Sequence, residues 1–566
     1  MKVVYTYFCI LTAFLCAGSL AAQNLDPTVE ISRAYEGKII EAQKPVREMT
    51  VPDSVSTFRL DFDYSVFDKP YKGAYDFNPY LMNMRPTATA YDPQNLYLKV
   101  GAGYRLRPEL DFIWSPELKP GLKMNIYATH KSYIGDYREI GTVQYKENAF
   151  CFDWIDNKKW NGYDLMTKAG ANLAYGWKVG VLDFNVNYFG LAGKNNSGTR
   201  GYDAVDVNLS LASNKDAQEN FVYRASLYYR YGEDKMHYGQ SSYLGEHLAA
   251  IGLSLGPVFK HGHKIVFDLG FDGALYNSMF NASVGKIYFV PRYLYSKGRF
   301  SLDAGVRLDA GLTRNPQQFI YPDVKMSFNI IKDAMQLYTT IKGGSNMNLY
   351  SSIINKNHHF DLATYYYPGA TFLLPEMVRV NATVGIKGRI ASKFSYDLRG
   401  GYVCYANSLL PALHFINGMG LQPAIAYGAY QKAFASVDWR WDAESFKFDG
   451  SVTYTQSWGF KKAEYAFAPA MLTGNVAFEY NWMKRIYAGV DCEFSTGRTM
   501  VGLPIEIVNP LTIPGYVDLG ISAEYAYNRK LSFWLRGGNL CCMTIQRTPL
   551  YAEGGISFTA GICVNL

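Results

Sequence analysis

Hydrophobic and polar residues alternate one by one over many stretches of this chain. Between Met377 and Arg389, valine, alanine or isoleucine fills every second position, and polar residues or glycine fill most positions between. Successive side chains of a β-strand point to opposite faces, so this stretch predicts a strand with one apolar and one polar face. The same pattern recurs at 180–191, at 299–311 and up to Leu566, the last residue.

These alternating stretches begin at Asn95 and number about 22, with roughly 20 to 24 as the range that the pattern allows. They predict strands at residues 95–104, 107–115, 120–133, 164–177, 180–191, 203–213, 219–231, 244–256, 263–276, 284–296, 299–311, 319–331, 334–345, 375–389, 392–403, 428–441, 444–457, 472–482, 485–495, 515–526, 529–540 and 552–566. Such a series is typical of a transmembrane antiparallel β-barrel, so the predicted fold class is all-β.

The connections between the predicted strands support the same interpretation, because short and long ones alternate. Outer-membrane barrels have short turns on the periplasmic side and longer loops outside. Short turns are expected at 178–179, 296–298, 332–333, 390–391, 442–444, 483–484 and 528. Long connections are expected at 134–163, 232–243, 346–374, 404–427, 458–471, 496–514 and 541–551. This alternation places both ends of the barrel in the periplasm, as an even strand number requires.

The chain begins with a region of a different kind. Lys2 precedes an apolar stretch, Val3–Leu20, and small residues follow it, which is the pattern of a secretory signal peptide. No later stretch reaches the roughly 18 apolar residues that a membrane-spanning helix needs. We therefore divide the chain into a signal peptide at 1–22, an N-terminal segment at 23–94 and an outer-membrane barrel at 95–566.

Residues 23–94 are rich in proline and contain aromatic clusters at 58–64 and 71–80. This composition does not suit a compact domain, and it is too aromatic for a purely disordered linker. We expect an extended segment that begins in the periplasm and partly threads or lines the lumen. The alternative is a periplasmic tail packed on the rim. The segment matters because a barrel of about 22 strands is wide, and barrels of that size have a plugged lumen.

The composition fits a barrel in an outer membrane. Aromatic residues make up 16% of the chain, with 47 tyrosines, and such residues form girdles where a barrel crosses the two membrane interfaces. The formal net charge is +7 with the signs interleaved, which indicates no nucleic-acid partner. The expected partners are outer-membrane lipid and the machinery that assembles barrels in a Gram-negative outer membrane.

No set of residues predicts catalysis, a cofactor or a metal centre, so we expect a protein that is not an enzyme. His358, His359 and Asp361 are near one another in a long outside connection, and a solvated pair of histidines is the favoured interpretation. His261 and His263 lie in a predicted turn and are interpreted in the same way. The cysteines show no spacing typical of a metal site.

Charged residues on the polar face of the predicted strands are candidates for lining the lumen. Their signs are mixed, which favours cross-strand pairs that brace a hydrated wall over a selectivity ring of one sign. The candidates are Asp303, Arg307, Asp309, Arg379, Lys387 and Arg389.

With its signal peptide, wide even-numbered barrel and alternating last strand, the chain resembles the TonB-dependent receptors, in particular the receptor-like barrels of Bacteroidota. The resemblance covers 95–566. Near the mature N-terminus, Thr28, Val29, Glu30, Ile31 and Ser32 resemble the TonB box, by which such receptors bind TonB through strand addition. The chain departs from the family in having no room for a full-size plug domain.

Three functions are compatible with the sequence. The favoured one is receptor-like uptake of a nutrient across the outer membrane, either passive or coupled to TonB or another periplasmic protein through residues 24–94. A second is a structural or assembly barrel that anchors a periplasmic or surface partner. A third is a channel of 14 strands for a hydrophobic solute, with the N-terminal segment as a short hatch.

Overall fold

The computed structural model describes residues 95–566 except 105, 120, 147–148, 195–197, 214–220, 239–241, 260–261, 278–281, 313–317, 332–333, 359–372, 391–392, 417–419, 464 and 503–510. The predicted signal peptide and the segment 23–94, with the TonB-box-like Thr28–Ser32, lie outside the described residues. Among the described residues, no helix has both the length and the apolar character needed to cross a membrane.

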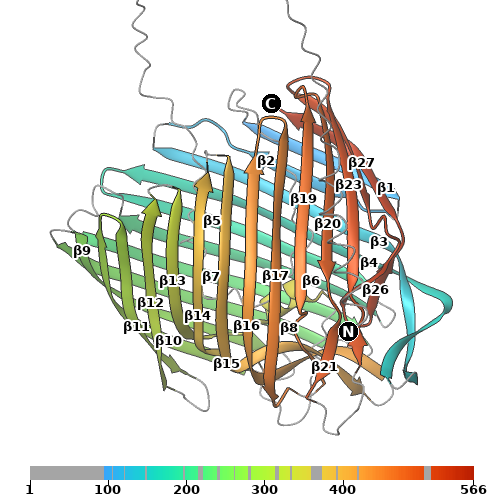
Figure 1. Ribbon diagram of the computed structural model, residues 1–566, viewed down its shortest axis with the longest axis horizontal. Coiled ribbons are helices and arrows are strands. Elements are labelled where there is room, and N and C mark those ends of the chain that lie inside the picture. The colour runs from blue at the N-terminus through green and yellow to red at the C-terminus, as the bar shows by residue number, and fades with distance from the viewer. Residues whose placement is uncertain are drawn as a thin grey trace, which may run out of the picture. The chain divides into compact units, whose positions relative to one another are not determined.

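Antiparallel strands that follow one another along the chain pair side by side and close into a barrel (Figure 1). The last strand, β27 (Ser557–Asn565), pairs with the first, β1 (Leu96–Tyr104), from Tyr97 opposite Asn565 to Tyr104 opposite Phe558. The described residues form 27 strands, of which 22 make the barrel. The other five are short and lie in the long connections.

The barrel strands agree with the predicted ones in number and order. They are β1, β2 (Glu109–Trp114), β3 (Leu122–Lys146), β4 (Ala149–Trp177), β5 (Gly180–Lys194), β6 (Gly198–Ser213), β7 (Phe221–Tyr238), β8 (Ser242–Phe259), β9 (His263–Asn277), β10 (Ala282–Lys297), β11 (Phe300–Gly311), β12 (Gln318–Ile331), β13 (Met335–Asn346), β14 (Glu376–Ile390), β15 (Phe394–Ile416), β16 (Gly420–Asp442), β17 (Phe446–Lys461), β19 (Leu472–Trp482), β20 (Ile486–Ser495), β23 (Tyr516–Ala526), β24 (Leu531–Gly538) and β27. The expected all-β barrel of about 22 strands is confirmed, and the 14-stranded alternative is wrong.

Several long connections differ from the prediction, because the strands continue into them. The β3–β4 ladder extends to Lys146 opposite Ala149, and the β15–β16 ladder extends to Ile416 opposite Gly420. The sequence pattern predicts loops there. Outside the membrane a strand does not need an apolar face toward lipid, so period-two alternation is not required and the sequence pattern that marks a spanning strand fades.

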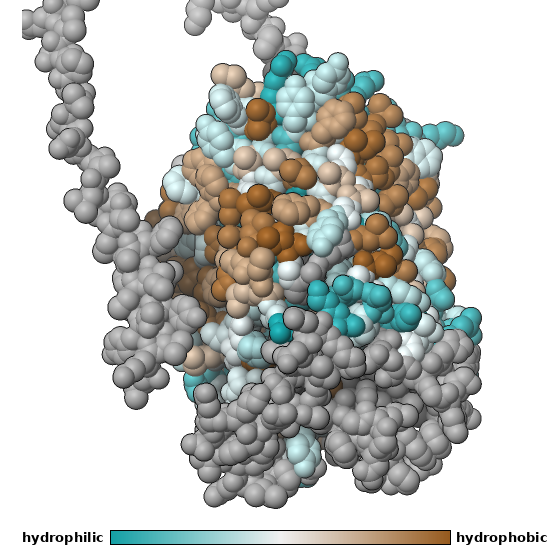
Figure 2. All heavy atoms as spheres, turned by 90° about the vertical axis from the view of Figure 1, so that its right-hand side faces the viewer, coloured by the Kyte–Doolittle hydropathy of each residue, from teal (hydrophilic) through white to brown (hydrophobic). Residues whose placement is uncertain are grey.

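The outer face of the barrel is apolar. Val384, Leu269 and Ile251 lie on it and remain 53%, 49% and 53% exposed. Their neighbours in sequence point to the other face, where Thr383 and Asp268 are buried. Figure 2 shows apolar side chains gathered over the middle of the outer surface. An apolar surface of this extent is unfavourable in water and is satisfied by lipid.

Aromatic rings cluster near the short turns at one end of this apolar band. Phe394 and Phe446 both contact Trp441, with ring centroids 6.0 and 5.1 Å away. The ring of His263 lies 4.7 Å from that of Tyr295. These positions match a girdle at the periplasmic interface, where rings with a polar edge meet both lipid and water.

A charge placed on the apolar face tests this orientation. We expect Val384→Arg to destabilise the folded barrel by about 2–4 kcal/mol, because Val384 lies near the middle of its strand and an arginine there would face hydrocarbon. Asn381→Arg, on the polar face of the same strand, serves as the matched control and should cost far less. Urea unfolding in lipid vesicles measures both, and equal costs for the two variants would contradict the assignment of the faces.

Candidate functional site

The inner face of the barrel carries charges that pair across neighbouring strands. Arg292 on β10 binds Asp268 on β9 through its Nε, 2.6 Å from Oδ2, and its Nη1 lies 3.4 Å from Asp303 on β11. All three side chains are largely shielded from water. A single arginine therefore bridges carboxylates of two flanking strands, and Asp303 is held by this bridge.

Arg307 and Asp309 form a second cluster further along β11. Their side chains are 2.7 Å apart, and the Arg307 guanidinium lies 4.7 Å from the ring centroid of Tyr288. The buried Asp309 carboxylate also accepts a hydrogen bond from the backbone N–H of Ser345, at 2.8 Å. Lys286 donates to the carbonyl oxygen of Ser345 at 2.6 Å. These charges fix the outer end of β13.

The remaining candidates lie on β14 and do not join these clusters. Arg379 is exposed at a β-bulge, where the pairing with β15 skips from Val378 to Val380. Lys387 is exposed with its Nζ 5.3 Å from the ring centroid of Tyr338, and Arg389 is exposed near the periplasmic end. Among the six sequence candidates, the structure therefore brings together Arg307 and Asp309, and a role of the set in lining a solute passage stays a prediction.

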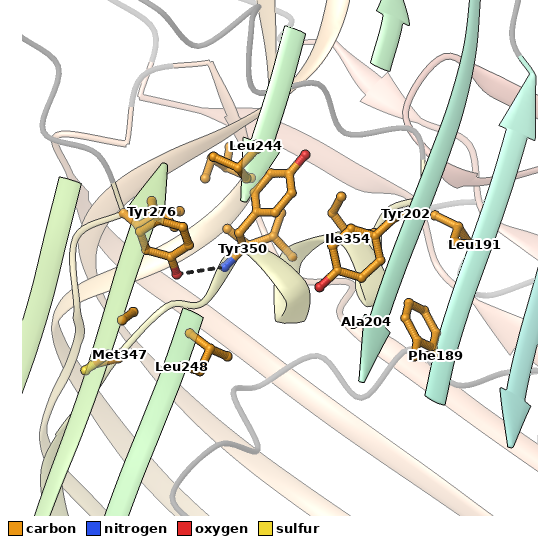
Figure 3. Close-up of a cluster of buried hydrophobic side chains, with 14 residues drawn as sticks. Phe189, Leu191, Tyr202, Ala204, Leu244, Leu248, Tyr276, Met347, Tyr350 and Ile354 are labelled. Carbon is orange, nitrogen blue, oxygen red and sulfur yellow. Dashed lines mark hydrogen bonds between the residues drawn. The ribbon is translucent and has the colours of Figure 1, made fainter. Parts of the chain in front are cut away.

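A short helix, α2 (Tyr350–Lys356), lies inside the outer mouth of the barrel, where the sequence analysis expected an outside loop. Its side chains Tyr350, Ile353 and Ile354 are buried in the barrel's main apolar cluster. Figure 3 shows Tyr350 and Ile354 among side chains of the barrel wall. The wall residues of this cluster include Phe189, Leu191, Tyr202, Leu244, Leu248 and Tyr276.

Polar contacts fix α2 to the same wall. The hydroxyl of Tyr350 donates to Asp234, whose carboxylate also lies 3.4 Å from Nε of Arg200. The backbone N–H of Ser351 donates to Glu246 at 3.3 Å. All of these wall side chains are buried. The first turn of the helix thus lies on two carboxyl groups of the wall.

The residues after α2 continue these contacts. Nδ1 of His358 lies 2.7 Å from the carboxylate of Asp164. The backbone carbonyl oxygen of His358 accepts a hydrogen bond from Arg200 at 2.8 Å. His359, Asp361 and His261 lie outside the described residues. Nδ1 of His263 lies 2.6 Å from the hydroxyl of Tyr293. Within the described part of the chain, no three histidine, cysteine or acidic side chains come together as a metal site.

A cavity of about 660 Å³ lies along the other part of the inner wall, from β14 through β27 and on to Glu109 of β2. On the outside it is bounded by residues of the short strands β21 (Arg498–Val501), β25 (Thr544–Thr548) and β26 (Tyr551–Gly554). Arg547 on β25 lies 2.6 Å from Asp518 and 3.5 Å from Glu493 on the barrel wall. This pair of ion pairs attaches the outer boundary of the cavity to the wall beneath it.

Side-chain hydroxyl groups form a row across this wall. Strand register places Ser436 of β16 opposite Thr453 of β17, Thr453 opposite Thr473 of β19, and Thr473 opposite Ser495 of β20. The Ser436 and Thr453 hydroxyls lie 2.9 Å apart, and Tyr516 continues the row on β23. All five line the cavity. The row offers neutral hydrogen-bonding groups to a solute, beside charged side chains of the same cavity such as Arg399, Lys432 and Asp491.

Neither the α2 segment nor the cavity was foreseen from the sequence. The apolar spacing of Leu349, Tyr350, Ile353 and Ile354, at i and i+4, is a helical signal inside a stretch interpreted as a loop. The cavity left no such signal, because its lining depends on the register of neighbouring strands and on the connections that return over them.

Comparison with solved structures shows the same architecture. The copper transporter OprC matches with a TM-score of 0.62 and 10% identity, over 84% of this chain and 80% of that chain. The siderophore receptor PiuA from Acinetobacter baumannii matches with a TM-score of 0.59 and 10% identity, over 84% and 82% of the two chains. The FrpB iron transporter from Neisseria meningitidis matches with a TM-score of 0.63 and 9% identity, over 84% of this chain and 82% of that chain.

These neighbours share the closed barrel of TonB-dependent receptors. This chain has the fold of an outer-membrane β-barrel. The closed barrel and its apolar outer face agree with the expected location in a Gram-negative outer membrane. By their names, the three neighbours are two transporters and a receptor. At 9% to 10% identity the likeness concerns the fold. No family model matches the chain, and no curated protein matches it.

Proposed function

We propose that the protein is a receptor-like transporter that takes up a polar nutrient across the outer membrane. The observation that carries the proposal is the occupied interior of a wide barrel. A barrel of 22 strands leaves a large lumen when it is empty. Here α2 fills part of the outer mouth, and a bounded cavity with hydrogen-bonding walls lies beside it. A general pore has no need of such a cavity.

The fold likeness supports transport. The neighbours include a copper transporter, a siderophore receptor and an iron transporter, all built on the same barrel. The structural or assembly alternative is less well supported, because a barrel that only anchors a partner does not require a cavity lined with hydroxyl groups. We place the solute passage along the wall from β15 to β27, next to the cavity.

Energy coupling through the segment Thr28–Ser32 is part of this proposal. A TonB box acts by adding an extended strand to its partner, so its backbone N–H groups are needed. Residues 24–94 would then bring this strand, or a contact with another periplasmic protein, to the barrel from the periplasm.

A proline substitution tests the coupling. We expect Ile31→Pro to reduce nutrient-dependent growth to the level of a strain that lacks the protein, because proline removes a backbone donor from the added strand. Ile31→Val, which keeps the donor and the strand propensity, should leave growth unchanged. The amount of protein in the outer membrane is measured alongside. Unchanged growth with Ile31→Pro would show that uptake does not depend on this segment.

A second substitution tests the cavity. Thr453→Val removes one hydroxyl of the row with little change in volume, so we expect the apparent KM of uptake to rise by roughly twofold to twelvefold, the effect of one hydrogen bond of about 0.5–1.5 kcal/mol. Thr129→Val, on the inner face of β3 outside the cavity lining, is the matched control. An equal KM in both variants would argue against the cavity as the solute site.

A further inference from the structure

The α2 segment connects two walls of the barrel that do not pair with each other. Its apolar cluster contains Phe189 of β5 and Tyr276 of β9 on one wall, and Ile425 of β16 on another. Leu409 of β15 packs against the same cluster. Strands β9 and β16 are separated by the whole series from β10 to β15. The segment therefore crosses the interior instead of lying along one strand.

The barrel does not need this segment to close. At the ends of the strands that flank it, Asn346 pairs with Glu376, so the β13–β14 ladder is complete without the residues between them. Residues Tyr350–Lys356 add no strand to any sheet. Their burial therefore serves a different purpose from holding the wall together.

The contacts between α2 and the wall are noncovalent and can form and break without unfolding the barrel. Arg200, Asp234 and Glu246 are almost completely buried beneath α2. Buried charged groups are costly unless they are paired, and water can solvate them once the segment leaves. When α2 docks, the burial of Tyr350 and Ile354 stabilises the docked state, and the loss of water around the charged groups destabilises it. Because these two contributions to the free energy oppose each other, we expect a docked and an undocked state whose populations a solute or a proton can shift.

We propose that residues 347–358 form an outer gate of this barrel: docked across the interior they block the part of the outer mouth beside the cavity, and they must leave the wall for solute to pass. This inference names the regulation of the transporter proposed above and rests on that proposal for its biological meaning. The closure itself is a property of the barrel and can be measured without a known substrate.

The deciding experiment is the conductance of the full chain in planar bilayers. Because Asn346 and Glu376 already face each other, a two-residue asparagine–glycine turn can replace residues 347–375 and leave the ladder intact. We expect the shortened protein to conduct severalfold more than the original chain. Heat-modifiable migration on gels shows that the barrel has folded.

A pair of point variants repeats the test without shortening the chain. Ile354→Asp places a charge in the apolar cluster and should release α2, so conductance should rise as in the shortened protein. Asn355→Asp adds the same charge at the neighbouring exposed position and should leave conductance unchanged. If the folded, shortened protein conducts no more than the original chain, the gate proposal is wrong.

The outcome is independent of the transport proposal. If conductance rises in the shortened protein but no nutrient depends on the protein for uptake, the gate stands and the proposed function fails. If nutrient uptake requires the protein and shortening changes neither uptake nor conductance, the function stands and the gate fails.

Discussion

The structure depends on one constraint, the need of every backbone N–H and C=O group in hydrocarbon for a partner within the protein. Lipid offers none, so a sheet in a membrane must have no open edge. The seam between β27 and β1 meets this condition up to the chain end, where Leu96 and Leu566 exchange hydrogen bonds of 2.8 and 2.9 Å. Closure also divides the side chains into two sets, one toward lipid and one toward the interior.

Closure at 22 strands creates the next problem, which is the width of the interior. The inner wall is braced by cross-strand charges such as Arg292 between Asp268 and Asp303. The outer mouth is filled by segments that return from the outside: α2 against one part of the wall, and β21, β25 and β26 above the cavity. Mainly apolar contacts hold α2 against the wall. The ion pairs of Arg547 hold the segment that contains β25.

The spanning strands were predictable because the two faces of each strand meet different solvents. Val384 and Thr383 differ in polarity for that reason, and the alternation is written into adjacent residues. The interior was not predictable. Tyr350 and Ile354 carry a helical signal, but their partners Tyr202 and Ile425 lie far along the chain. The cavity likewise depends on which strands stand opposite one another, and only the closed barrel determines that.

The central claim is that this chain spans the outer membrane as a barrel with lipid on one face of each strand. Spin labels placed one at a time at residues 380–387 of β14, in lipid vesicles, test it most directly. The account predicts that collision with oxygen, which concentrates in lipid, is high at 380, 382, 384 and 386 and low at the positions between. Accessibility without this period of two, or with the opposite phase, would contradict it.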